Sequence, residues 1–391
     1  MKLSQPSSAR QINTYRILNL LRKQNEWKVP KSNLETFTLI NDEMDDLILS
    51  KAEISRILSL NKVSTGEIIS SLIEEGIVEE YAKIGTTSGG RKATAIRLVK
   101  MARFVIAIEI GPRTTNVNLC NLALDVLRFE RIKTRVDKRQ EDFVVDLIKS
   151  CIRALKPLKE NQILGIAVTL HGKISEDKKI IESCPYLPWK DIDLVTALNQ
   201  NLKIPVILEN SLNALVLAEE IKGNETLAYL DWGERLDLAI VSGSRVISRN
   251  SNFGHLKVSK TGLCSCGKIG CLEAVAATWV LAQSPDSSLA EIWPSGVEKK
   301  VFERVAYALS VANLVTGCQR IILGGQSSTI PDRYLDILKT DFKHLLHKYS
   351  EPVEIERSKL GDKANILATA SVGLDEFFFH TTFLDSLQEF I

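Results

Sequence analysis

No hydrophobic run in this 391-residue sequence approaches the roughly 18 apolar residues that a membrane-spanning helix needs. The first residues, Met1–Pro6, lack the apolar stretch of a signal peptide, so we expect a cytoplasmic protein without membrane insertion. Seven cysteines are an odd number, which fits a reducing compartment better than a disulfide framework. A net charge of +2 is too small to indicate a nucleic-acid partner by itself, so the local placement of cations must decide.

The length exceeds that of one ordinary domain, and 45% hydrophobic with 25% charged residues is typical of a globular protein. Changes of pattern along the chain predict three parts, namely residues 1–100, 101–222 and 223–391. Four cysteines are predicted to be buried small hydrophobic residues rather than reactive thiols: Cys120, Cys151, Cys184 and Cys318.

The densest cluster of candidate ligands lies between residues 255 and 271. His255 precedes three closely spaced thiols, Cys264, Cys266 and Cys271, and two glycines allow tight turns between them. A Cys₃His set is a common tetrahedral site for structural zinc. The alternatives are a disulfide, which the missing export signal disfavours, or a chance cluster, which rarely includes the glycines and the histidine.

The first hundred residues predict a helix-turn-helix. An amphipathic helix is expected at 12–23, and two shorter helices begin at predicted capping boxes, Ser50 with Glu53 and Ser64 with Glu67. The first of these short helices spans 51–59, and the second stops at Gly76. A short turn at 60–62 joins them.

A β-hairpin follows these helices. Strands are predicted at 77–81 and 95–99, and the tip between them carries Arg91 and Lys92, which can reach phosphate or the minor groove. Such a wing indicates DNA binding, with a small protein-interaction domain as the alternative. The residues expected to face bases or phosphates at the start of the second short helix are Lys62, Ser64 and Thr65. The acidic insertion 25–49 is expected to be a solvated loop or an interaction element that points away from DNA.

From Phe104 onward the pattern indicates an α/β fold. Strands are predicted at 104–110, 115–120 and 126–132, then a helix at 142–155 and a buried strand at 163–170. Strands at 227–232 and 236–241 begin a second set in the same order. The duplicated order predicts two α/β lobes with a cleft between them.

The stretch from Gly254 to Glu273 resembles the signature of the ROK family, which groups repressors, open reading frames and kinases acting on sugars. The segments 72–78 and 88–91 are similar to the winged DNA-binding head of ROK repressors. Residues 101–391 resemble the two-lobed, actin-like (ribonuclease H-like) body of ROK sugar kinases. The resemblance therefore implies a winged helix-turn-helix on a sugar-kinase body, with a C-terminal helix that returns to the first lobe.

This sequence departs from the family's kinases where phosphoryl transfer is most demanding. The first phosphate loop of such kinases reads Asp-x-Gly-Gly-Thr, but here Glu109 replaces the aspartate and Pro112 removes a main-chain donor. The second loop, 231–239, keeps only Gly233, and we expect its bulky side chains to occupy the place of the triphosphate. The family's catalytic aspartate corresponds to Ser211, which cannot act as a base without assistance.

Only part of the family's sugar site is retained. The resemblance maps its ligands onto the lost base at Ser211 and onto four further residues: Asn210, Asn252, His255 and Glu273. Asn252 stands where the family has glutamate. Zinc on one nitrogen of His255 would leave the other free for a ligand, and the metal loop would position Glu273. The structural alternatives are a helix cap for Asn210 and a surface carboxylate for Glu273.

We therefore expect a DNA-binding regulator, most simply a repressor, of sugar uptake or metabolism genes that has no enzymatic activity. It should bind a double-stranded operator as a homodimer or a dimer of dimers. Its effector is expected to be a sugar, a sugar phosphate or a protein partner. Two alternatives stay open: an active or bifunctional ROK sugar kinase, and a regulator sequestered by a phosphotransferase-system protein without a sugar ligand.

Overall fold

The computed structural model describes residues 9–22, 49–84, 93–134, 140–156, 158–188, 190–219, 225–243, 245–247, 252–282, 288–347 and 351–380. They divide into two compact units, and each is considered by itself. The first unit contains the described residues up to 214 together with those from 365 onward, and the second contains 215–364. Arg91, Lys92 and nearly all of the acidic insertion lie outside the described residues. Within the described residues, no helix is both long and apolar enough for a membrane span.

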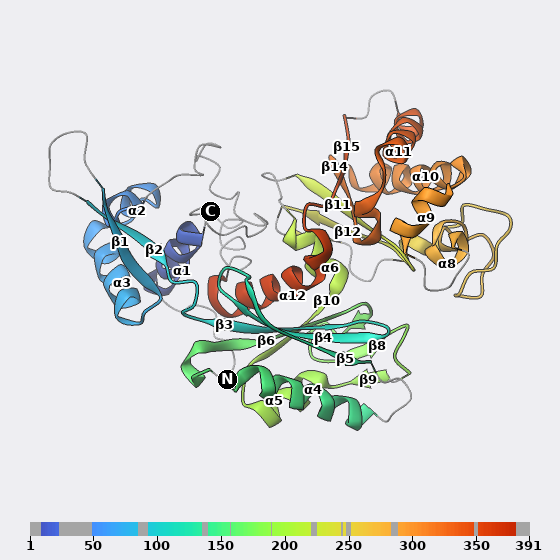
Figure 1. Cartoon of the computed structure of the whole chain (residues 1–391). Coiled ribbons are helices and arrows are strands. Elements are labelled where there is room, and N and C mark those ends of the chain that lie inside the picture. Colours follow the sequence, from blue (N-terminus) through green and yellow to red (C-terminus); the bar gives the residue numbers. More distant parts are fainter. Residues whose placement is uncertain are drawn as a thin grey trace. The chain divides into compact units, whose positions relative to one another are not determined.

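The helices and the hairpin of the first hundred residues lie where the sequence predicts them (Figure 1). They are α1 (Ala9–Arg22), α2 (Lys51–Ile57), α3 (Lys62–Glu74), β1 (Val78–Ile84) and β2 (Ala93–Leu98). The predicted capping box of α2 is confirmed. The main-chain N–H of Ser50 donates to Oε2 of Glu53 at 2.7 Å, and the Glu53 N–H donates to Oγ of Ser50 at 3.3 Å.

The predicted capping box of α3 is wrong. This helix begins at Lys62, and its cap is Asn61, whose Oδ1 accepts hydrogen bonds from Val63 at 2.8 Å and Ser64 at 3.4 Å. Asparagine is at least as good a helix N-cap as serine, so the earlier residue captures the helix start. Ser64 and Glu67 therefore lie inside the first turns of the helix.

A five-stranded sheet forms the middle of the first unit. Its order is β10-β6-β3-β4-β5, with β3 antiparallel to β4 and parallel to β6. The strands are β3 (Phe104–Ile110), β4 (Thr114–Asn121), β5 (Val126–Lys133), β6 (Ile163–Leu170) and β10 (Val206–Asn210). Helices α4 (Gln140–Leu155) and α5 (Leu194–Leu202) cover one face, and α12 (Ala364–Leu374) covers the other (Figure 1). The smaller elements are η3 (Glu160–Gln162), β7 (Lys173–Ile174), β8 (Ile181–Ser183) and β9 (Lys190–Ile192), and α6 (Ser211–Ala218) spans the division at residue 214.

The second unit repeats this sheet. Its order is β13-β12-β11-β14-β15, and β11 is again antiparallel to its sequence neighbour β12 and parallel to β14. The strands are β11 (Thr226–Trp232), β12 (Leu236–Ser242), β13 (Arg245–Val246), β14 (Arg320–Gly324) and β15 (Glu354–Arg357). The helices and turns are η4 (Phe253–His255), α7 (Glu273–Ala276), α8 (Thr278–Leu281), α9 (Leu289–Ser295), α10 (Lys299–Thr316), η5 (Gly325–Thr329), α11 (Asp332–Leu345) and η6 (Gly361–Lys363). The repeat confirms that the duplicated strand order encodes two α/β lobes.

The C-terminal segment ties the first hundred residues to the first sheet. Helix α12 lies against β3 and β6, where Thr369 and Thr169 share a hydrogen bond of 2.6 Å and Gly373 packs on Val105. It continues into a π-helical turn, η7 (Asp375–Phe379). Side chains of α1, α3, β2, β3 and η7 form one continuous hydrophobic core. The predicted boundary at residue 100 therefore does not separate two cores, because the head and the first sheet share one.

The four cysteines predicted to be structural are all buried free thiols: Cys120, Cys151, Cys184 and Cys318. Burial raises the pKa of Cys120 and of Cys151 to about 12, so neither thiol ionises near neutral pH. They act as small hydrophobic residues, as predicted.

Candidate metal centre and helix-turn-helix surface

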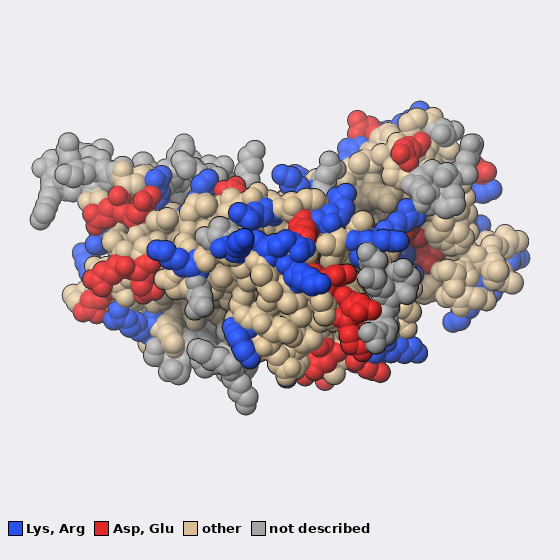
Figure 2. All heavy atoms as spheres, turned by 60° about the horizontal axis from the view of Figure 1, so that its bottom comes forward, with Lys and Arg blue, Asp and Glu red and all other residues tan. Residues whose placement is uncertain are grey.

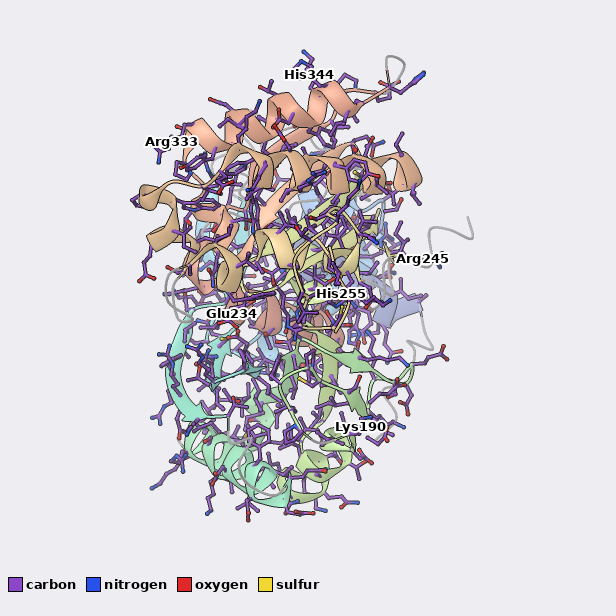
Figure 3. The ribbon with its side chains drawn as sticks, turned by 90° about the vertical axis from the view of Figure 1, so that its right-hand side faces the viewer. Lys190, Glu234, Arg245, His255, Arg333 and His344 are labelled. Carbon is purple, nitrogen blue, oxygen red and sulfur yellow. The ribbon has the colours of Figure 1, made fainter. Side chains whose placement is uncertain are left out.

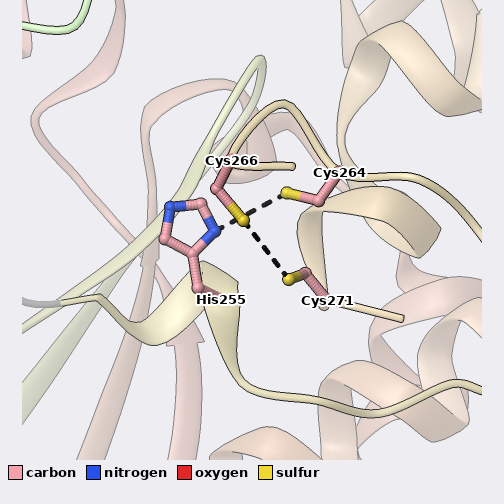
Figure 4. A group of neighbouring side chains, drawn as sticks. All are labelled: His255, Cys264, Cys266 and Cys271. Atoms are coloured by element: carbon pink, nitrogen blue, oxygen red, sulfur yellow. Dashed lines mark hydrogen bonds between the residues drawn. The ribbon is translucent and has the colours of Figure 1, made fainter. Parts of the chain in front are cut away.

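One imidazole and three thiols come together in the second unit. The candidate ligand atoms of His255, Cys264, Cys266 and Cys271 all lie within 4.8 Å of one another (Figure 4). Nδ1 of His255 is 3.6 Å from Sγ of Cys264, and the Sγ atoms of Cys266 and Cys271 are 3.7 Å apart. Tetrahedral bonds to zinc of ~2.1 Å from nitrogen and ~2.3 Å from sulfur place such atoms ~3.6–3.8 Å apart. The donor set and its spacing therefore fit zinc, whereas a disulfide needs sulfurs at ~2 Å.

The loop that carries the thiols is shaped by its own main chain. The N–H of Cys264 donates to Lys268 at 2.8 Å, and the N–H of Gly267 donates to Cys264 at 2.9 Å. Gly270 has φ +86°, and a Cβ atom there would lie 1.9 Å from the carbonyl oxygen of Ser259. Only glycine allows this approach, so the glycines of the motif shape the chain so that its thiols converge.

The four candidate ligands differ in their environment. Cys264 and Cys271 are buried and Cys266 is exposed. A hydrogen bond from the main chain of Lys268 lowers the pKa of the Cys266 thiol, whereas burial raises the pKa of Cys271 to about 12. A bound divalent cation favours the thiolate at each cysteine, which links metal binding to the folding of this loop.

Within the second unit, His255 lies away from α11, which carries Arg333 and His344 (Figure 3).

Glu273 contacts the same cluster. Its Oε2 lies 3.8 Å from Sγ of Cys264 and 3.9 Å from Nδ1 of His255, and its Oε1 accepts a 3.4 Å hydrogen bond from the N–H of Leu236. Only 5% of its side chain is exposed, so the surface-carboxylate alternative is wrong. Gly254 allows this placement, because a Cβ atom there would lie 2.8 Å from Glu273. Glu273 is thus positioned to orient the ligands of the cluster.

The start of α3 presents a small group of exposed side chains. Lys62 and Ser64 are exposed, and Val63 between them is 69% exposed. Val63 is not among the residues predicted to face DNA, although the asparagine cap immediately before Lys62 places it in the exposed first turn. An exposed apolar side chain at a recognition helix can contact a thymine methyl group.

Thr65 must be removed from the predicted DNA-facing set. Its side chain is fully buried, and its Oγ1 has no hydrogen-bond partner among the described residues. Because α3 begins at Lys62, Thr65 falls on the same side as Ile68 and Ile69, which pack in the core. The predicted contacts Arg91 and Lys92 lie outside the described residues.

The charge of the face drawn in Figure 2 is mixed rather than of one sign. On the face shown in Figure 2, groups of Lys and Arg side chains alternate with groups of Asp and Glu. This mixture agrees with the net charge of +2. Any contact with DNA must therefore come from local cations and not from the charge of the whole protein.

Comparison with known proteins decides the family. The model described as "ROK family" matches residues 105–375, which is more than half of the chain. The chain belongs to the ROK family. The sequence resemblance, drawn mainly from the cysteine motif, is confirmed.

Several ROK relatives of this chain are named repressors. A xylose repressor of Caldicellulosiruptor bescii is 26% identical over 375 residues, which cover 85% of this chain and 93% of the relative. The DNA-binding transcriptional dual regulator NagC of Escherichia coli is 27% identical over 248 residues, or 60% of each chain. These names support the expectation of a sugar-related regulator rather than an enzyme.

Solved ROK structures share the fold. One is described as a ROK family transcriptional regulator, a homologue of the Escherichia coli MLC protein. It aligns with 96% of this chain and 99% of its own at 17% identity and a TM-score of 0.71. A ROK glucokinase from Streptomyces griseus with glucose and AMPPNP aligns with 69% of this chain and 98% of its own, at 19% identity and a TM-score of 0.57. The α/β body therefore has sugar kinases among its structural neighbours.

The ROK kinase positions in the first unit have structural roles here. Glu109 accepts a 2.9 Å hydrogen bond from Asn116, and Ser211 is the first residue of α6. Asn210 caps α6: its Oδ1 accepts from the N–H of Leu212 at 2.8 Å, and its Nδ2 donates to the carbonyl of Gly172 at 2.8 Å. The helix-cap alternative is therefore confirmed for Asn210, and both polar atoms of its side chain already have partners.

The loop at 231–239 differs from the expectation in one respect. Trp232 does not occupy the place of a triphosphate, because its side chain is fully buried in the core of the second unit. Its ring centroid is 5.8 Å from that of Trp293, and its Nε1 donates to the carbonyl of Ala276 at 2.7 Å. The hairpin itself is tight, since the N–H of Gly233 donates to Arg235 at 2.9 Å.

The five predicted sugar-contacting positions fall into two groups. Asn210 and Ser211 belong to the first unit, and Asn252, His255 and Glu273 belong to the second. Asn252 is exposed, and its carbonyl accepts a 2.9 Å hydrogen bond from the N–H of His255. In the second unit, three of the five positions, Asn252, His255 and Glu273, thus lie on or next to the segment that carries the candidate metal ligands.

Proposed function

We propose that this ROK protein is a DNA-binding transcriptional repressor of sugar-related genes. The observation that carries the proposal is the exposed start of α3 in a helix-turn-helix followed by a hairpin. There Lys62, Val63 and Ser64 point outward while the opposite side of the helix packs in the core. A recognition helix uses this end to contact base edges and phosphates in the major groove. The hairpin β1–β2 serves as the wing, and Arg91 and Lys92 lie in the segment that joins its strands.

The ROK body is proposed to sense and not to phosphorylate. Phosphoryl transfer needs a base at the sugar hydroxyl and main-chain donors around the phosphates. Ser211 cannot replace the family's aspartate, and Pro112 supplies no N–H. A hexose panel with ATP should show no turnover above the rate without protein. Sustained turnover that disappears on altering Ser211 would establish the kinase alternative.

The effector is proposed to be a sugar or sugar phosphate that contacts Asn252, His255 and Glu273 in the second unit, with a phosphotransferase-system protein as the second candidate. The sugar candidate is supported by the names of the relatives. The protein candidate is supported by the loss of the family's residues at Ser211 and Asn252. Calorimetry with xylose, glucose and N-acetylhexosamines, beside a pull-down with a purified phosphotransferase protein, separates the two.

The metal is proposed to be one structural Zn²⁺ per chain on His255, Cys264, Cys266 and Cys271. The ion would supply a fixed tetrahedral point around which residues 255–273 fold. The protein is proposed to act in the cytoplasm as a homodimer or a dimer of dimers on a two-fold operator.

A mobility-shift titration on the DNA upstream of the protein's own gene tests the central proposal. Sequence-specific binding that an effector weakens is the expected result. The substitution Lys62→Ala should weaken binding, and Lys149→Ala, which removes an exposed lysine from α4, is the matched control. Binding that is indifferent to sequence and lost at moderate salt would overturn the repressor proposal.

A further inference from the structure

The exposed side of α3 follows a single line of residues. Val63, Glu67, Ser70 and Glu74 are spaced by four, three and four positions, so they follow one another along one side of the helix, and all four are exposed. Leu72 lies on the opposite side and is buried in the core of the first unit. Val63 is the only apolar residue on the exposed line, and it is the first.

The charges along this line show which end of α3 can approach DNA. Glu67 and Glu74 place carboxylates on the later turns, whereas the first turn holds no acidic residue and carries Lys62. Oε2 of Glu67 lies 3.8 Å from Nη1 of Arg10, which offsets part of its charge. Phosphate groups are therefore repelled least at the start of the helix, and a recognition helix presents that end to the major groove. Val63 then faces the edges of the base pairs.

Packing within the described residues does not account for a valine at this position. Val63 is 69% exposed, more than any other large hydrophobic residue described in the first hundred residues. A β-branched side chain also lowers helix propensity, so local structure does not favour it either. Unmodified B-DNA displays one apolar group in its major groove, the 5-methyl group of thymine. The exposed methyl groups of Val63 match that group in size and polarity.

Gly66 lies beside Val63 on the surface of α3, three positions later. Its φ is not in the positive range, and a Cβ atom there would meet no described heavy atom within 4 Å. Neither backbone strain nor packing therefore requires a glycine, although alanine is more favourable inside a helix. The missing side chain leaves the main chain of α3 uncovered, which lets the edge of a base pair or a sugar-phosphate strand come closer.

We infer that Val63 reads the 5-methyl group of a thymine in the operator, and that Gly66 allows α3 to enter the groove deeply enough for this contact. The inference rests on the proposed function, because it requires operator DNA at the start of α3. It goes further by naming the residue that selects a base and the chemical group that it selects.

Replacing thymine by deoxyuridine tests the inference, because it removes the 5-methyl group and leaves the hydrogen-bonding groups unchanged. A duplex from the DNA upstream of the protein's own gene is substituted one thymine at a time, and its affinity is measured by mobility shift at constant salt. The wild type should lose affinity about fourfold at the contacted position, the value for one buried methyl group. Val63→Ala should bind the unmodified duplex more weakly and should not respond to deoxyuridine at that position. Val145→Ala, at a side chain on α4 that is 44% exposed, is the matched control and should respond as the wild type does.

Gly66→Ala provides a second readout. This substitution should raise the melting temperature, because alanine favours the helix and its methyl group enters open space. It should also lower operator affinity about tenfold, because the added methyl group occupies the surface that approaches DNA. Ser70→Ala, one turn later on the exposed line, is the control. It should raise the melting temperature as well and leave operator affinity unchanged.

The outcomes separate this inference from the repressor proposal. A wild-type protein that binds its operator specifically but responds to no deoxyuridine substitution would overturn the thymine contact alone. The same holds for a Val63→Ala variant that is folded and responds at every position as the wild type does. A Gly66→Ala variant that binds as tightly as the wild type would overturn the part assigned to Gly66. A wild-type protein without sequence-specific binding would overturn the repressor proposal and, with it, this inference.

Discussion

The side chain of Asn19 in α1 donates a hydrogen bond of 2.7 Å to the main-chain carbonyl of Phe379, 360 positions later in the sequence. The ring of Tyr15 lies 4.3 Å from that of His380, and the guanidinium of Arg22 lies 4.3 Å from the ring of Phe379. The first helix of the head is therefore held by the end of the described chain. This contact links α1 directly to the C-terminal segment that packs on the first sheet.

Asn19→Ala should destabilise the first unit by about 1–3 kcal/mol, because the buried carbonyl of Phe379 would lose its donor. Urea unfolding followed by far-UV circular dichroism measures the change. Asn13→Ala is the matched control on the same helix, since it removes only a 3.5 Å contact with Arg16. Equal stability of the two variants would show that the Asn19 contact does not hold the head.

Metal analysis should find one zinc ion per chain, and Cys266→Ser should reduce this content and lower the melting temperature. The reason is that a zinc ion held by four side chains at once would stabilise the folded geometry of loop 255–273. Ser265→Ala, between two of the cysteines, should change neither quantity. A chelator should lower the melting temperature of the wild type and of Ser265→Ala alike. A metal-free protein with an unchanged melting temperature would contradict the zinc proposal.

Lys62→Ala should weaken operator binding and reduce the slope of log affinity against log salt by about 1, the value expected for one phosphate contact. Thr65→Val is the comparison on the same helix. The hydroxyl of Thr65 is buried and has no hydrogen-bond partner among the described residues, so its replacement should leave DNA affinity unchanged and stability equal or higher. Mobility shifts at several salt concentrations measure both variants. A larger loss of affinity for Thr65→Val than for Lys62→Ala would mean that α3 does not present the surface described.

Stability should depend on pH through Glu219, which is buried beside Ser358 in the second unit. Burial raises the pKa of this carboxyl to about 7, against 4.5 for an ordinary glutamate. Between these values the folded state binds more protons than the unfolded chain, so the free energy of unfolding falls as pH rises. The stabilising contribution of Glu219 is complete below pH 4.5 and lost above pH 7. Between these values the free energy of unfolding changes by at most about 1 kcal/mol per pH unit.

Glu219→Gln should flatten this dependence and stabilise the protein at pH 8. The charges of Arg320 and Lys359 lower the pKa of Glu219, and the charge of Glu356 raises it. Glu356→Gln serves as a comparison, because Glu356 is a carboxylate that is already ion-paired with Arg320. Urea denaturation at pH 5, 6, 7 and 8 provides the test. The same slope in Glu219→Gln and wild type would assign the pH dependence to another group.

The sequence by itself determined the features that depend on residues close together in the chain. The cluster of His255, Cys264, Cys266 and Cys271 is brought together by local turns, so residue type and separation predicted it. The positions of the predicted strands along the chain follow from runs of apolar residues, and the loss of the family's base at Ser211 is visible in the sequence itself. Each of these features depends on neighbours within a few tens of residues.

Only the tertiary structure decided the features that depend on distant partners. Thr65 and Ser64 are adjacent hydroxyl residues, and the register of α3, fixed by Asn61, buries one and exposes the other. Trp232 packs in the core because its ring contacts Trp293 and its Nε1 donates a hydrogen bond to Ala276. These partners lie 44 and more positions later in the sequence, so local sequence does not predict the contact. The contact between Asn19 and Phe379 joins residues 360 positions apart. Burial of a side chain depends on residues from distant parts of the folded chain, so local spacing in the sequence does not predict it.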